Sequence, residues 1–281
     1  MLKQYILYSI AIIFSLAACN LEQEIDLQLP EYNAQVAVEC YLEPGEPFTV
    51  LLTRSAGYFD AFPTLDESLV ENLLEQDAEV SITLDTTTYV LENEIGFNVF
   101  TGKIYNYSNG IIVPENYDDD FVLNITTKDG ETITSTTQLL TPVVTDSIVV
   151  EFDENIDTLA RLLSYFSDDP TQENWYRRMV HKGTLDSLEF EFALNDQFVD
   201  DGNLVFGTGF DYVEGDTIFS TLFHITEEYH DFLESIGGAL DANGNPFGQP
   251  SSILSNVTGT ADPIGIFTGL ARETELVIIQ K

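Results

Sequence analysis

Positive charge is scarce in this chain of 281 residues. It has 10 lysines and arginines against 48 aspartates and glutamates, which gives a formal net charge of −38. Such a surface repels phosphate groups, so the composition argues against nucleic acid as a partner. It also repels anionic lipid, so contact with a membrane would need an anchor. The acidity itself is explained by solubility, or by attraction of cations or a basic partner.

The chain also lacks an apolar run long enough to span a membrane. The run over residues 5–18 follows the single cation Lys3 and ends in small residues. A spanning helix needs about 20 apolar residues, so a run of this length is typical of a cleaved signal peptide. The sequence therefore predicts that residues 1–18 are removed and that the protein is exported.

The predicted signal peptide ends in Leu16-Ala17-Ala18-Cys19, which resembles the bacterial lipobox. The resemblance implies that the Cys19 thiol takes a diacylglycerol, that the signal is cut before Cys19, and that the new amino terminus is acylated. Several acyl chains, at about 0.8 kcal/mol per buried CH2, hold a protein stably on a bilayer. The alternative is an ordinary secretory signal in which Cys19 is incidental.

Residues 19–30 are acidic and predict a lipidated tether. They are similar to the acidic segments that follow the cysteine in surface-exposed lipoproteins of Bacteroidota, although a plain solvated linker explains them equally well. We expect a lipid-anchored protein of the outer membrane that faces outward. If Cys19 is lipidated, Cys40 has no partner for a disulfide. Its place among alternating apolar residues predicts an inert buried thiol.

Apolar residues recur at every second position through most of the chain, which is the pattern of half-buried β-strands. Turn signals separate these runs at Pro44-Gly45, Asn109-Gly110 and Asp129-Gly130. We expect a mainly β protein with two antiparallel β-sandwich-like domains. The first, Ig-like, covers residues 31–142, and the second covers residues 143–281.

The second domain is predicted to carry one amphipathic helix near residues 226–236. Its apolar residues fall at i, i+3, i+4 and i+7, and they are Tyr229, Phe232, Leu233 and Ile236. Thr226 can cap its start, and Gly237-Gly238 is predicted to end it. In the first domain, residues 57–76 predict a loop with one short helix. Its aromatic residues either rim a ligand site or fold onto the sandwich.

Histidine is rare, and no zinc pattern is complete. His224 and His230 lack the His-Glu-x-x-His spacing that puts two imidazoles on one helical face. Asp241 opens a stretch similar to an EF-hand loop, but Pro246 and Ser252 stand where that loop needs glycine and glutamate. We assign no metal ligand and no catalytic residue.

Two acidic groups leave calcium binding open. They are residues 118–120, and Asp196 with residues 200–201. Carboxylate oxygens suit calcium, but acidic residues are also common at solvated hairpin ends, which is the favoured interpretation.

Several short motifs occur in a fixed order over nearly the whole chain. In the first half they are Ile25-Asp26-Leu27, Val38-Glu39 and residues 52–55 before Tyr58-Phe59. In the second half they are residues 166–170, 173–177, 201–202, 214–217, 244–247, 255–259 and 265–267. Their order resembles the domain-of-unknown-function family numbered 4249, although Trp175 stands where the family more usually has tyrosine.

The resemblance implies an outer-membrane lipoprotein of Bacteroidota, in a family often encoded beside TonB-dependent outer-membrane receptors. It implies no catalytic residue. We therefore predict a non-catalytic binding or accessory module without a cofactor, with a TonB-dependent receptor as partner in nutrient uptake. A structural or assembly lipoprotein and a surface hydrolase stay open. An aromatic-lined pocket would favour a small ligand, and a flat apolar patch would favour a protein partner.

Overall fold

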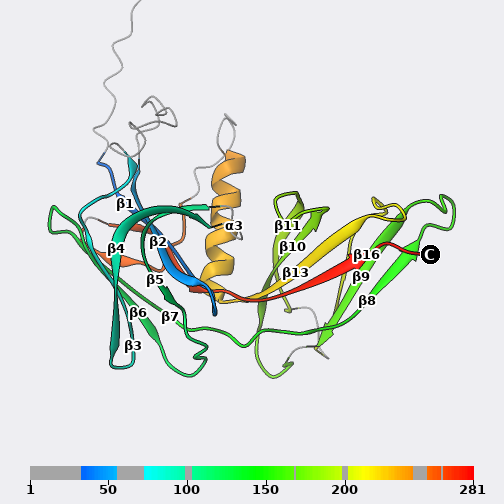
Figure 1. Cartoon of the computed structure of the whole chain (residues 1–281), viewed down its shortest axis with the longest axis horizontal. Helices are drawn as coiled ribbons and strands as arrows, with labels where there is room; N and C mark the ends of the chain where they lie inside the picture. Colours follow the sequence, from blue (N-terminus) through cyan, green and yellow to red (C-terminus); the bar gives the residue numbers. More distant parts are fainter. Residues whose placement is uncertain are drawn as a thin grey trace, which may run out of the picture. The chain divides into compact units, whose positions relative to one another are not determined.

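The computed structural model confirms a mainly β fold with sandwich-like sheets and one helix in its described part (Figure 1). It describes residues 33–55, 73–98, 103–167, 169–197, 202–242, 252–260 and 262–281. Alternation of apolar and polar residues accounts for most strands, because successive side chains of a strand point to opposite faces. In β1, for example, Val36, Val38, Cys40 and Leu42 are buried and the residues between them are half-buried.

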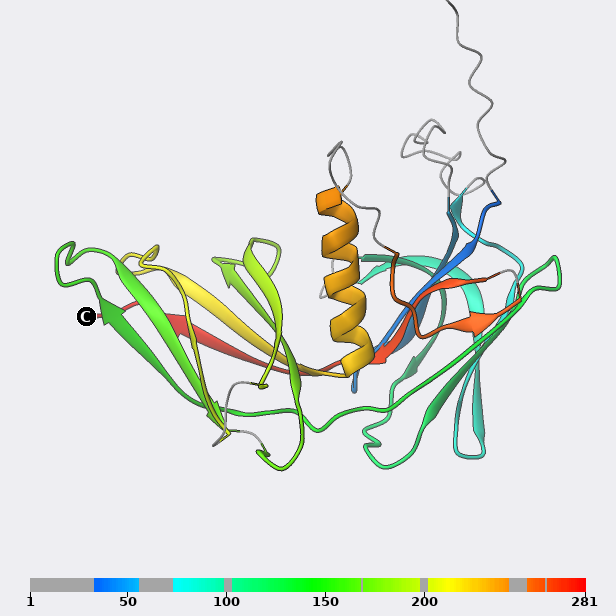
Figure 2. The ribbon, with the colours of Figure 1, turned by 180° about the vertical axis from the view of Figure 1, so that it is seen from behind.

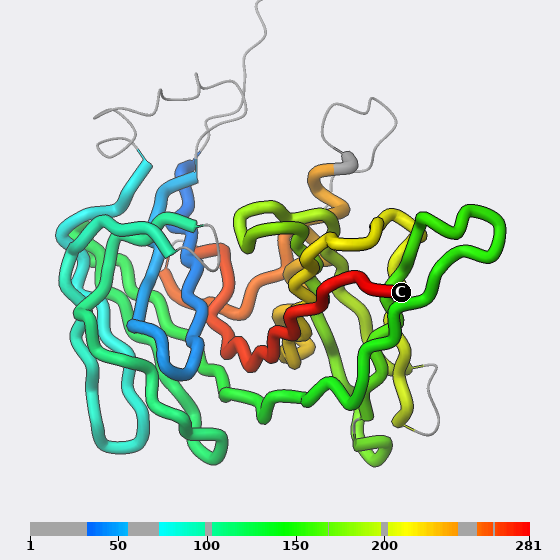
Figure 3. The backbone as a smooth tube through the Cα atoms, turned by 45° about the vertical axis from the view of Figure 1, so that its right-hand side comes forward, coloured from blue at the N-terminus to red at the C-terminus, as the bar shows by residue number. Residues whose placement is uncertain are grey.

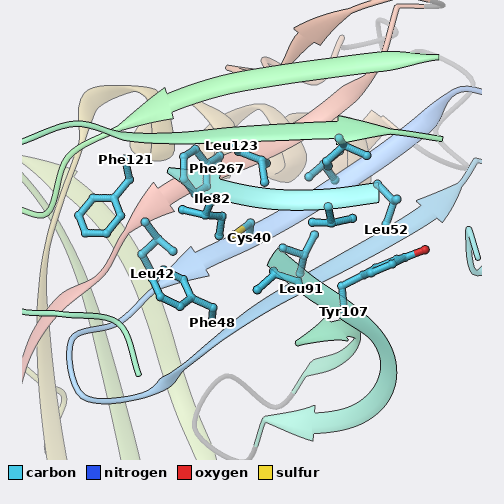
Figure 4. Close-up of a cluster of buried hydrophobic side chains, with 14 of the residues drawn as sticks. Cys40, Leu42, Phe48, Leu52, Ile82, Leu91, Tyr107, Phe121, Leu123 and Phe267 are labelled. Atoms are coloured by element: carbon cyan, nitrogen blue, oxygen red, sulfur yellow. The ribbon is translucent and has the colours of Figure 1, made fainter. Parts of the chain in front are cut away.

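The first half of the chain builds most of a nine-stranded sheet with the order β14-β7-β6-β3-β4-β5-β2-β1-β15. The strands are β1 (Val36–Leu42), β2 (Pro47–Arg54), β3 (Glu79–Leu84), β4 (Thr87–Asn98), β5 (Lys103–Ile112), β6 (Phe121–Thr126), β7 (Thr132–Thr137), β14 (Thr258–Gly259) and β15 (Ile264–Gly269). The long strand β4 pairs with β3 over its first part and with β5 over its second. The two halves of the sheet enclose one apolar core, which includes Cys40 and Phe267 (Figure 4).

The second half builds a sandwich from a four-stranded sheet, β11-β10-β13-β16, and a three-stranded sheet, β12-β9-β8. The strands are β8 (Thr145–Phe152), β9 (Ala160–Ser167), β10 (Trp175–Lys182), β11 (Leu188–Asn195), β12 (Asn203–Gly207), β13 (Thr217–Ile225) and β16 (Ala271–Ile278). The helix α3 (Glu227–Ala242) follows β13. An extended connection, residues 138–144, carries the chain from β7 to β8 (Figure 3).

After the sandwich the chain returns to the first sheet. Strand β15 lies parallel to β1, with Val38 opposite Gly265 (Figure 2). Asn256 fixes the returning strand, because its side chain donates to the Phe267 carbonyl at 2.7 Å and accepts from the Phe267 N–H at 2.9 Å. Ser135 of β7 donates to the Asn256 carbonyl at 2.8 Å. The nine-stranded sheet is therefore completed by residues that lie between α3 and β16 in the chain, and the boundary predicted at residue 142 stays a prediction.

The structure confirms some of the predicted turns and helix ends and contradicts others. Thr226 caps α3, because its Oγ1 accepts from the Tyr229 N–H at 3.3 Å. Gly237-Gly238 does not end the helix, which continues to Ala242, since neither glycine adopts a positive φ. Asn109-Gly110 forms no hairpin turn; it lies inside β5, where Gly110 has a φ of 67° beside an irregularity in the β2 pairing. The short helix predicted within residues 57–76 lies mostly outside the described residues.

Arg178 is fully buried between the two sheets of the sandwich, with 1 % of its surface exposed. Its Nη2 donates to Ser164 Oγ at 3.1 Å and to Ser220 Oγ at 3.3 Å, while Nε and Nη1 have no hydrogen-bond partner in the described structure. The guanidinium lies 6.0 Å from the Phe190 ring and 5.7 Å from the Phe206 ring, within range of cation–π attraction. Burial lowers its pKa to about 10.

Gly265 gives a test of the returning strand. Its φ is 134°, and a Cβ at this position would overlap the backbone of Val38. We expect Gly265→Ala to lower the free energy of unfolding by about 2–4 kcal/mol, because the β1–β15 pairing must shift. Urea denaturation of the full chain measures this change.

Gly237→Ala is the matched control. Gly237 lies inside α3, and a Cβ there would meet open space. This substitution should raise the free energy of unfolding by about 1 kcal/mol, because alanine is the better helix former. A Gly265→Ala protein as stable as the wild type would contradict the pairing described for β15.

Candidate interaction surface

The outer face of the four-stranded sheet is only half covered. At one end of this face, Phe223 and Ile225 of β13 pack with Trp175 and Met179 of β10 under the helix α3. Tyr229, Phe232, Leu233 and Ile236 supply the apolar side of α3, as the helical periodicity predicted. This contact explains why α3 is stable, since an amphipathic helix depends on burying its apolar stripe.

The other end of the same face is open to solvent. We call it the open face and define it by Leu185, Leu188, Phe219, Leu276 and Ile278. Phe219 is half-buried, and the other four are between 38 % and 54 % exposed. Strand pairing places Leu188, Phe219 and Leu276 in one row across the sheet, since each is linked through the register of β11, β10, β13 and β16. Paired residues share a face, so their side chains form one surface.

A groove of about 380 Å³ crosses the open face. It is lined by Leu185, Phe219, Arg272, Thr274 and Leu276. Thr274 is fixed by a hydrogen bond of 2.9 Å between its Oγ1 and Thr221 Oγ1. The lining is therefore mostly apolar, with one guanidinium at its end.

The charges around the open face are unbalanced. The cations beside it each form an ion pair, and the pairs are Arg177–Glu191, Lys182–Asp216 and Arg272–Glu43. Asp186 and Glu189 are exposed and flank Leu185 and Leu188 in sequence, whereas Glu275 is paired with Ser220 and lies on the opposite face of β16 from Leu276. Within the described part of the chain, neither Asp186 nor Glu189 has an ion-pair partner. The rim of the open face is consequently negative.

A second hollow, of about 300 Å³, lies beside the β1–β2 turn. Glu43, Glu46, Glu115, Tyr117 and Arg272 are among its lining residues. Glu43 is 7 % exposed, and burial raises the pKa of its carboxyl to about 7, although Arg272 offsets part of the rise. Arg272 thus belongs to both hollows, with its guanidinium paired to Glu43.

The candidate residues predicted from sequence do not gather at either hollow. Cys19 lies outside the described residues. His224 Nδ1 lies 2.8 Å from the Thr141 carbonyl, and its ring stacks on Tyr176. His230 lies on α3 with its Nδ1 3.3 Å from Asp231. In the described part of the chain, no three His, Cys, Asp or Glu side chains are grouped to hold a metal ion.

The predicted acidic groups have structural partners where they are described. The Asp196 carboxylate accepts from the Asn174 N–H at 3.1 Å and from its Nδ2 at 2.8 Å. The Asp119 carboxylate accepts from Asn116 Nδ2 at 3.0 Å, and the Asp120 carboxylate accepts from Gln138 Nε2 at 2.6 Å. Residues 200–201 lie outside the described residues. Cys40 is fully buried, as expected for an inert thiol, and burial raises its pKa.

The buried Glu43 predicts a dependence of stability on pH. Its folded pKa of about 7 lies above its ordinary value of 4.5, so the folded state binds more protons within this window. Stability from Glu43 is therefore present below about pH 4.5 and is lost as pH rises to about 7. We expect Glu43→Gln to exceed the wild type in free energy of unfolding at pH 8, by an amount on the order of 3 kcal/mol, with little difference at pH 4.5.

Urea denaturation across this pH range measures the effect. Glu92→Gln, which changes an exposed glutamate of β4, is the matched control and should keep the pH profile of the wild type. Parallel profiles for Glu43→Gln and the wild type would show that Glu43 is ionised without penalty.

No helix in the part of the chain that the structure describes is long and apolar enough to cross a membrane.

Comparisons with known proteins identify the family. A search of curated proteins gave no match. A family model described as Domain of unknown function (DUF4249) matches residues 22–275, which confirms the resemblance found in the order of the sequence motifs. Because this match spans most of the chain, the protein belongs to the DUF4249 family.

Proposed function

We propose that this protein is a lipid-anchored, outward-facing accessory module of the outer membrane. It binds a partner protein, a TonB-dependent receptor that takes up nutrients, and it performs no catalysis. The observation that carries the proposal is the open face, an apolar surface with a negative rim on a chain whose net charge is −38. Exposed apolar surfaces of this kind mark sites of protein interaction.

The hollows described above favour a protein partner over a small ligand. Small-ligand sites are usually concave, mostly apolar and deep enough to bury the ligand. Here the apolar groove is open, and the hollow at Glu43 is lined by several carboxylates. A third hollow, beside Tyr41 and Lys103, has a volume of about 10 Å³, which suits no more than one water molecule.

Two sequence features support the anchor and the identity of the partner. Leu16-Ala17-Ala18-Cys19 resembles a lipobox, and acylation of Cys19 would attach this acidic protein to a membrane without a basic surface. The family resemblance to lipoproteins encoded beside TonB-dependent receptors supports a receptor as the partner.

A pull-down from native outer membrane tests the proposal. The tagged full chain is solubilised in mild detergent, and the proteins recovered with it are identified by mass spectrometry. We expect a TonB-dependent receptor in near-stoichiometric amount. The intact mass of the lipoprotein should equal residues 19–281 plus the lipid.

Cys19→Ala is the control variant. It should leave the membrane fraction, carry no lipid mass and recover far less receptor, because it loses the local concentration that the shared membrane provides. Recovery of the wild-type lipoprotein without a receptor would contradict the accessory function. An acylated protein without a partner would leave the anchor correct and the partner wrong.

A further inference from the structure

We propose that the open face binds an apolar segment of the partner protein in which the apolar residues are flanked by lysine or arginine. This inference rests on the proposed function, because it specifies the chemistry of the partner that the accessory module contacts. It assigns the contact to Leu185, Leu188, Phe219, Leu276 and Ile278, and the charge selection to the carboxylates beside them.

The half-covered outer face of the four-stranded sheet indicates an apolar contact. The side chains of β10 and β13 under α3 and those of the open face lie on the same outer face of the four-stranded sheet, with Leu185 in the turn between β10 and β11. The covered end is buried by the apolar stripe of a helix. The open end presents four large aliphatic side chains and Phe219 with nothing over them in the described structure. A second amphipathic segment would complete the layer that α3 begins.

The charges beside the open face select which apolar segment of the partner can bind. Arg177, Lys182 and Arg272 are each neutralised by a carboxylate of this chain. Asp186 and Glu189, which flank Leu185 and Leu188, are left without ion-pair partners among the described residues. Burial lowers the pKa of His181, which lies in the row between Leu188 and Phe219, and the nearby carboxylates of Glu191 and Asp186 oppose part of that shift. A basic flank on the partner complements the carboxylates of Asp186 and Glu189, and an acidic flank is repelled.

A second copy of this chain is a poor occupant for the same reason. Two copies would bring together surfaces that each belong to a chain with a net charge of −38. Their negative rims would meet around the apolar contact, and like charges opposed across an interface weaken binding. Anionic lipid is disfavoured by the same repulsion.

Site-specific photo-crosslinking tests the inference in the full-length lipoprotein. Ile278, which is 48 % exposed, is replaced by p-benzoylphenylalanine, and cells are irradiated before the outer membrane is solubilised. We expect one adduct, whose crosslinked peptide has apolar residues at the contact and lysine or arginine within a few residues on either side. The crosslinked peptide is sequenced by mass spectrometry.

Second-site variants measured with the same probe test the apolar contact and the charge selection separately. Leu276→Ser should reduce the adduct by at least about tenfold, because a leucine that is buried on binding is lost. The combined change Asp186→Asn and Glu189→Gln should reduce it several-fold and also weaken its dependence on salt. Val90→Ser is the matched control, since Val90 is a 65 % exposed apolar residue on β4, and it should leave the adduct unchanged.

Each outcome of these experiments either supports the inference or overturns it. An adduct to an apolar, basic segment that responds to both changes supports the inference. No adduct, or an adduct to a second copy of this chain, to lipid, or to a segment without basic residues, overturns it. If the wild type still recovers a receptor while Leu276→Ser has no effect on that recovery, the accessory function stands and the open face is the wrong surface. If the wild type recovers no receptor, the proposed function fails first.

Discussion

The pairing of β15 with β1 is the constraint on which the rest of the structure depends. Without residues 264–269, the first sheet would end at β1. These residues follow α3 in the chain and add the final strand, β15. The fit is close, because Gly265 lies against the Val38 backbone with no room for a side chain. Leu270 then donates its N–H to the Leu42 carbonyl at 2.8 Å, directly before β16 begins. The second half of the chain is thus held to the first at both of its ends.

This return also decides what α3 can cover. The helix follows β13 directly and precedes the segment that returns to the first sheet, so it lies over the end of the four-stranded sheet where Phe223 and Ile225 are found. Its Tyr229 contacts Tyr41 of β1 with 5.7 Å between ring centroids, and the Tyr229 hydroxyl accepts from Arg177 at 2.8 Å. A helix fixed at both sheets cannot also extend over Phe219 and Leu276. The open face is therefore a consequence of topology.

The net negative charge of the chain is compatible with an exposed apolar surface. Copies that each carry a net charge of −38 repel one another, so an apolar surface can stay exposed without driving self-association. Arg178, by contrast, forms no ion pair with a carboxylate among the residues that the structure describes. That guanidinium is buried with two serine hydroxyls and two aromatic rings, a costly arrangement that good packing can offset.

The sequence by itself indicated the mainly β fold, the amphipathic helix and the family. Period-two alternation predicted half-buried strands such as β1 around Cys40, and the spacing of Tyr229, Phe232, Leu233 and Ile236 predicted α3, because these patterns record which side of each element is buried. Only the tertiary structure decided that β15 joins β1, that Asn109-Gly110 lies within β5, and that one end of a sheet face is open. Leu276 and Phe219 alternate as core residues do, and the sequence cannot tell whether another layer covers them. That distinction depends on contacts between residues far apart in the chain, which local periodicity does not encode.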